Sequence, residues 1–167
     1  MKKLLLVAGI LLLASVPAKA QIAPHAEIFG GYSYMRFSPS DGGANLNGWN
    51  FSVNFKPTSI VGVVADFSGE SGSPAGFNTT MHTFLFGPQF TFPGTVSPFV
   101  HVLFGAGHVN IAGDTNTSFA TAIGGGVDFH VAPHISVRPI QFDEVFTRFN
   151  GGSQNDARLS LGVVVHF

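Results

Sequence analysis

The sequence predicts an all-β protein, an eight-stranded antiparallel up-and-down β-barrel that spans a membrane. Two features of composition point this way: charged residues make up only 10% of the 167 residues, and phenylalanine and glycine number 18 and 21. The third feature is alternation with period 2, which places apolar and small polar side chains on opposite faces of a strand. A soluble barrel would carry charges on its polar face, but Gly, Ser, Thr and Asn dominate that face here. The apolar face is therefore expected to lie in lipid.

The first 20 residues predict an export signal, which would leave residues 21–167 as the barrel domain. Lysines at positions 2 and 3 provide a positive start, an apolar run extends from Leu4 to Val16, and Ala18-Lys19-Ala20 has the A-x-A form of a cleavage site. The apolar run is too short for a membrane-spanning helix, which needs about 20 residues. We therefore expect the chain to cross the membrane with strands.

Eight segments have the alternation of a membrane strand, and each can supply the roughly 9 to 11 residues needed for a tilted crossing. They are Ala26 to Phe37, Asn47 to Lys56, Ile60 to Glu70, Thr79 to Phe92, Phe99 to Ile111, Ser118 to Val131, Ile135 to Arg148 and Asp156 to Phe167. Four connections are long and polar, at 38–46, 71–78, 112–117 and 149–155. Three are short and contain proline, at 57–59, 93–97 and 132–134. This strict alternation predicts that the short turns and both termini face the periplasm.

The last predicted strand has an alternating apolar face that ends in an aromatic residue. Its members are Leu159, Leu161, Val163, Val165 and Phe167. This pattern resembles the signal that the barrel assembly machinery of Gram-negative bacteria recognises.

Three further motifs accompany this pattern: Phe29-Gly-Gly-Tyr-Ser-Tyr34, Leu46-Asn-Gly-Trp49 and Ile123-Gly-Gly-Gly-Val-Asp128. With them, residues 21–167 resemble the outer membrane protein A-like and X-like barrels, and more narrowly the short, stand-alone outer-membrane β-barrel proteins. The resemblance implies a place in the cell outer membrane, contact with its lipid and lipopolysaccharide, and handling by periplasmic chaperones and the assembly machinery. It names no substrate.

Six charged residues fall on predicted inward faces: Glu27, Lys56, Asp66, Asp128, Arg138 and Arg158. An eight-stranded barrel is only wide enough for its side chains to fill it. We therefore expect these charges to pair across a packed lumen. The alternative is a narrow small-solute channel that the same groups line.

The turn Ala132-Pro133-His134 predicts one of these pairs. If the turn is centred on Pro133, Asp128 lies opposite Arg138, close enough for a bidentate contact between carboxylate and guanidinium. The same register pairs Val131 with Ile135 and His130 with Ser136. Pro139 could mark a bulge, beyond which the register would shift.

The seven histidines and the lack of cysteine give no recognisable metal site, so we expect no metal, cofactor or catalytic residue. One enzymatic alternative is lipid A modification, because His134-Ile135-Ser136 resembles the H-x-S element of small outer-membrane deacylases. A triad also needs an acid within reach, and Arg148 stands about where that acid should lie. The turn is moreover expected on the periplasmic side.

Without the signal, five basic and nine acidic residues remain, a formal charge of about −4. A nucleic-acid partner is excluded, because it would need clustered Lys and Arg to neutralise phosphates. We expect a monomeric, non-enzymatic barrel with a structural, surface-interaction or adhesion role. The predicted loops carry no aromatic or basic cluster that would identify an external partner.

Overall fold

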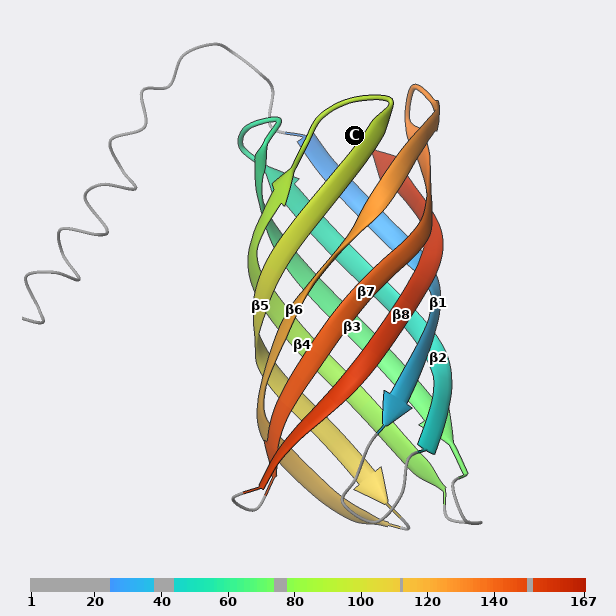
Figure 1. The fold of residues 1–167 in the computed structure, drawn as a ribbon, viewed down its shortest axis with the longest axis vertical. Coiled ribbons are helices and arrows are strands. Elements are labelled where there is room, and N and C mark those ends of the chain that lie inside the picture. Colours follow the sequence, from blue (N-terminus) through green and yellow to red (C-terminus); the bar gives the residue numbers. More distant parts are fainter. Residues whose placement is uncertain (1–24, 38–43, 74–77, 112, 150–151) are drawn as a thin grey trace, which may run out of the picture.

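The computed structural model describes residues 25–37, 44–73, 78–111, 113–149 and 152–167. Eight antiparallel strands form one closed barrel in chain order, and β1 pairs with β8 to close it (Figure 1). The predicted fold class is confirmed. The predicted export signal at residues 1–20 lies outside the described residues. In the part of the chain that the structure covers, no helix is long and apolar enough to cross a membrane.

The strands have the following bounds: β1 (His25–Phe37), β2 (Ala44–Lys56), β3 (Val61–Gly72), β4 (Thr79–Thr91), β5 (Val96–Ile111), β6 (Asp114–Ala132), β7 (Ile135–Phe149) and β8 (Gly152–His166). The start of β1 and the end of β8 lie at the upper end of the barrel in Figure 1. Connections 57–60, 92–95 and 133–134 lie at this end, which we call the turn end. The opposite end, with connections 38–43, 73–78, 112–113 and 150–151, is the loop end.

Two of the predicted long loops are short, so the strict alternation of loop lengths was wrong. β5 and β6 pair as far as Ile111 and Asp114, and β7 and β8 as far as Phe149 and Gly152. These strand ends are rich in polar residues and glycine, which apolar alternation cannot detect. They nevertheless satisfy their backbone groups by continuing the ladder.

The two faces of the barrel have the predicted character, and β4 shows it most clearly. Phe84, Phe86 and Phe90 are 47–64% exposed on the outside. Between them, Thr83 and Gln89 are 0% and 3% exposed in the lumen. The outside of the barrel is therefore an apolar surface suited to lipid.

Two glycines show why the inner face needs residues without side chains. A Cβ at Gly31 would lie 2.1 Å from the Leu161 carbonyl oxygen, and one at Gly105 would lie 1.9 Å from that of Phe84. Neighbouring backbones approach closely at these points, and only glycine fits there.

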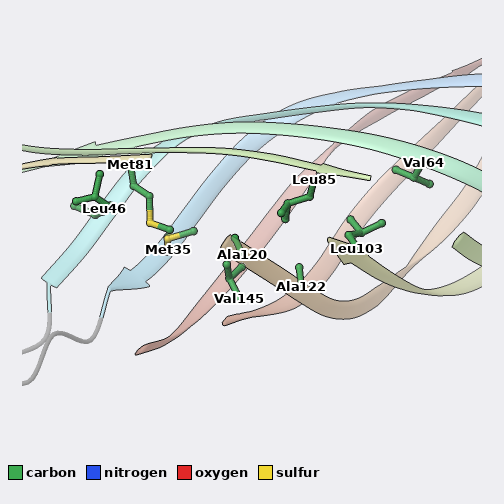
Figure 2. Packing of buried hydrophobic residues seen from close by; sticks show 10 residues of the cluster. Met35, Leu46, Val64, Met81, Leu85, Leu103, Ala120, Ala122 and Val145 are labelled. Carbon is green, nitrogen blue, oxygen red and sulfur yellow. The ribbon is translucent and has the colours of Figure 1, made fainter. Parts of the chain in front are cut away.

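The lumen contains a cluster of buried apolar side chains, shown in Figure 2. Met35, Leu46 and Met81 gather together there, each the third residue from the loop end of its strand. All three are fully buried. These three side chains fill the lumen toward the loop end beside the buried Glu70, which is the cross-strand partner of Met81.

The turn between β6 and β7 has two residues, Pro133 and His134, and not the predicted three. His130 pairs with Ser136 as expected, but Ile135 pairs with Ala132. Val131 is therefore an extra residue, and its predicted pairing with Ile135 was wrong. Such a bulge bends the strand locally.

A second irregularity lies at Pro139. Val137 pairs with Phe129, but Ile140 pairs with Val127, so the register shifts by one residue between them. The pairing of β7 with β8 shifts at the same place, between Arg138 and Gln141. Proline lacks the N–H that would continue the ladder, which accounts for the shift predicted beyond it.

Candidate functional site: the polar lumen

The structure places all six predicted charged residues inside the barrel, with exposures of 8% or less. They form three ion pairs: Lys56 with Glu27, Arg158 with Asp66, and Arg138 with Asp128. The pairs are held by β1, β2, β3, β6, β7 and β8.

Arg158 on β8 is the centre of the network and is fully buried. Its Nη1 lies 2.9 Å from Asp66 Oδ1, and its Nη2 lies 2.7 Å from Asp143 Oδ2. Nε also donates to Asp143 Oδ2, at 3.1 Å. One guanidinium therefore forms ion pairs with carboxylates from β3 and β7.

Asp143 is the central residue that the sequence did not reveal. It is fully buried, accepts from Gln141 Nε2 at 2.8 Å and lies 2.6 Å from His101 Nε2. The bulge at Pro139 explains the omission, because beyond it the odd-numbered residues of β7 face the lumen. The signal was present: Ile140 and Phe142 are apolar, whereas Gln141 and Asp143 are polar.

Glu70, the third residue from the loop end of β3, is fully buried. Ser33 donates to its Oε1 at 2.8 Å, and Ser68 donates to its Oε2 at 3.0 Å. Ser68 also lies 2.8 Å from the Thr83 hydroxyl. Hydroxyl groups from β1 and β3 thus donate to this carboxyl group on the loop side of Asp66, and Thr83 of β4 contacts the second of them.

Arg138 and Asp128 make the bidentate contact that the turn predicts. Arg138 Nε donates to Asp128 Oδ1 at 2.7 Å, and Nη2 donates to Oδ2 at 2.9 Å. The guanidinium carbon also lies 4.4 Å from the ring centre of Phe29 and 4.2 Å from that of Phe99. Cation–π contacts with both rings therefore add to the ion pair.

At the turn end, Glu27 joins the first, second and last strands. Its Oε1 lies 2.8 Å from Lys56 Nζ and 3.3 Å from His166 Nδ1, and its Oε2 accepts from Asn54 at 3.0 Å. The His130 ring stacks on the His166 ring with centres 4.9 Å apart. An open cavity of about 230 Å³ lies beside these groups and is also lined by Asp128.

The H-x-S element does not bring His134 to Ser136. His134 Nδ1 lies 3.2 Å from the backbone oxygen of His166, whereas Ser136 Oγ lies 2.7 Å from His166 Nε2. Because His166 Nδ1 faces Glu27, serine, histidine and acid lie in series across β7, β8 and β1. Sequence spacing could not show this, since the three residues are far apart in the chain. Ser136 has no exposed surface.

Among the residues described, no group of three His, Cys, Asp or Glu side chains is placed to hold a metal ion. His101 contacts the Asp143 carboxylate, and His166 contacts Ser136 through Nε2 and Glu27 through Nδ1. These two histidines thus have hydrogen-bonding roles within the lumen.

The alternating residues of the last strand lie on the outside of the barrel. Leu159, Leu161, Val163, Val165 and Phe167 are 37–66% exposed. Val164 between them is fully buried. The side chains expected to form the assembly signal therefore share one lipid-facing surface.

Comparison with known proteins gives one family and a set of similar folds. The model of the outer membrane protein beta-barrel domain family matches residues 6–167. Neisserial surface protein A has a similar structure, with a TM-score of 0.73 and 14% identity over 85% of this chain and 97% of that one. Ail, the attachment invasion locus protein of Yersinia pestis, has a TM-score of 0.66 and 18% identity over 86% of this chain and 99% of that one. The outer membrane protein OprG from Pseudomonas aeruginosa has a TM-score of 0.57 and 9% identity over 87% of this chain and 96% of that one. No curated protein matches the sequence.

Proposed function

Because this chain belongs to the outer membrane protein beta-barrel domain family, we propose that it is a non-enzymatic barrel that acts through its surfaces, in a structural, interaction or adhesion role. The observation that carries the proposal is the filled lumen. Arg158 and its acids occupy the centre, and Met35, Leu46 and Met81 occupy the loop side. A filled barrel leaves its loops and lipid face as the parts available to partners. The names of two similar structures, a surface protein and an attachment protein, support this role.

The proposal includes an orientation with the turn end in the periplasm and the loop end outside the cell. The chain has no cysteine, so single cysteines can report this without background. Asp114→Cys marks the loop end and Ser59→Cys the turn end, and both positions are exposed. On intact cells, a membrane-impermeant maleimide should label only Asp114→Cys. Labelling of Ser59→Cys alone would reverse the orientation and remove the surface role.

The partners proposed for this barrel are those of its environment: outer-membrane lipid and lipopolysaccharide, periplasmic chaperones and the barrel assembly machinery. The outward face of the last strand, ending at Phe167, supports recognition by the assembly machinery. A single closed barrel has no unpaired strand edge, which supports a monomer.

A second candidate function is ester hydrolysis at the turn end, and one observation favours it. Ser136 Oγ, His166 and Glu27 have the serial order of a nucleophile, base and acid. The full burial of Ser136 favours the structural alternative, because a substrate carbonyl must reach its hydroxyl. A fluorophosphonate probe separates the two: labelling that Ser136→Ala abolishes would establish an enzyme. Mass spectrometry of lipid A from cells with and without the protein tests the lipid A alternative directly.

A further inference from the structure

The open cavity at the turn end is lined by many separate elements of the barrel. Its lining residues come from β1, β2, β4, β5, β6 and β8 and from all three turns. Its volume is about 230 Å³. Pockets that hold drug-sized ligands have roughly 300 to 1,000 Å³, so a ligand that fits here must be small.

Both carboxylates in the lining of this cavity already have their hydrogen-bond donors. Glu27 Oε1 faces Lys56 Nζ and His166 Nδ1, and its Oε2 accepts from a neighbouring amide. Both carboxylate oxygens of Asp128 accept from the Arg138 guanidinium. Each carboxylate thus has a cation of its own, and neither requires a ligand that donates hydrogen bonds.

The donors in the same lining are not all used. Lys56 has three N–H groups, and Glu27 accepts from one of them. The Thr91 hydroxyl accepts from a glutamine amide at 3.2 Å, and its own O–H has no acceptor among the described residues. Within the same part of the chain, neither the Ser59 hydroxyl nor the His130 ring has a hydrogen-bond partner. The cavity therefore has a surplus of donors, which suits a ligand that accepts hydrogen bonds.

Histidines add a charge that depends on pH. The rings of His130 and His166 stack with centres 4.9 Å apart, and His25 lines the same cavity. His134, in the adjoining turn, contacts the backbone oxygen of His166. Among the described side chains, the charged groups around these rings cancel in two ion pairs, Glu27 with Lys56 and Asp128 with Arg138. Imidazole gains a proton as the pH falls from about 8 to 5. Each bound proton therefore gives the cavity a net positive charge, which an anion offsets.

We propose that the turn-end cavity binds a small free oxyanion of the phosphate or sulfate type, and that binding tightens as the pH falls. Lys56, Thr91 and His130 supply the donors, and the oxygens of a tetrahedral oxyanion accept from them. This binding activity goes beyond the surface role proposed above. In the proposed orientation the cavity opens to the periplasm, but the site itself does not depend on that orientation.

Sulfate is the probe for the pH dependence, because its charge does not change between about pH 8 and about pH 6, whereas that of imidazole does. The folded protein, with isotope-labelled histidine, is titrated at constant ionic strength in maltoside micelles, which contain no phosphate. The ring resonances of His130 and His166 should shift and saturate. Sulfate should bind about ten-fold more tightly at about pH 6 than at about pH 8, as expected for gain of a charge-assisted hydrogen bond. His82 and His108, on the outer face of the barrel, are internal controls and should not shift.

One pair of variants separates the cavity from the rest of the turn end. His130→Gln keeps a polar side chain but cannot gain a proton, and it should weaken sulfate binding about ten-fold at about pH 6. His134→Gln is the matched control, because His134 is also exposed at this end but does not line the cavity. It should leave sulfate affinity unchanged. Both positions are exposed, so both variants are expected to fold.

Competition identifies the form of the anion. Inorganic phosphate should displace sulfate, whereas chloride at the same ionic strength should not. A phospholipid added to the micelles should not displace sulfate either, because its headgroup lies outside the barrel. Equal affinity at the two pH values, equal binding by His130→Gln and wild type, or displacement by phospholipid but not by phosphate would overturn the proposal.

Discussion

The centre of the lumen and its turn end each contain an arginine paired with carboxylates, but the two guanidinium groups have different partners. Arg158 is fully buried and contacts two carboxylates, those of Asp66 and Asp143. Arg138 is also buried, at 4% exposed, but it contacts only one carboxylate, that of Asp128, together with Gln141 Oε1 and two aromatic rings. The difference shows two ways to compensate a buried guanidinium: two carboxylates at the centre, or one carboxylate with an amide oxygen and two aromatic faces at the turn end.

The largest effect should follow removal of the central arginine. Arg158→Gln leaves Asp66 and Asp143 buried without their cation, and should lower the free energy of unfolding by about 3 to 5 kcal/mol. Reversible urea unfolding in lipid vesicles measures this. Arg148→Gln, at an exposed position of β7, is the control and should change stability by less than about 0.5 kcal/mol. Equal effects of the two substitutions would contradict the central role of Arg158.

A smaller effect is expected at the turn end. Arg138→Gln and Asp128→Asn should each cost about 3 kcal/mol, because each leaves one buried charge without its partner. The double variant should cost less than the sum, with a coupling energy of about 1 to 3 kcal/mol. The same unfolding experiment, applied to the wild type, the two single variants and the double variant, completes this double-mutant cycle. Strictly additive effects would mean that the two side chains do not meet in the membrane.

The smallest effect on stability is expected beside the cavity at the turn end. Ser136→Ala removes the hydroxyl beside His166 Nε2 and should cost about 1 kcal/mol, the value of an ordinary hydrogen bond. Ser59→Ala in the exposed turn should cost almost nothing. If Ser136→Ala lowered the free energy of unfolding as much as Arg158→Gln, the turn end would contribute as much to stability as the centre, and the contrast between the two regions would fail.

The fold and most of the lumen could be predicted from the sequence, because one rule governs both. Alternation assigns each residue to lipid or lumen, and it placed Asp66, Arg138 and Arg158 on the inside. The rule fails where the backbone departs from period 2. Pro139 shifts the register, so Asp143 reached the lumen against the parity set by Arg138. A change of parity in the apolar residues after a proline within a strand is the signal to seek in such sequences.

Contacts between distant strands were beyond the sequence for another reason. Ser136, His166 and Glu27 meet because of the registers in which β8 pairs with β7 and closes on β1; alternation predicts the closure but not these registers. The same holds for the stacking of His130 on His166. The polar strand ends at Asp114 and Gly152 were missed because they lack apolar residues, not because they lack pairing.

The central claim is that the lumen is filled and the barrel acts through its surfaces. Single-channel recording of the purified, folded protein in a planar lipid bilayer tests it most directly. We predict no discrete conductance steps, because Arg158 with its acids and the cluster around Met35, Leu46 and Met81 occupy the interior. Reproducible steps from the wild-type protein, altered in size by Arg158→Gln, would show an open path through the charged centre and contradict the account.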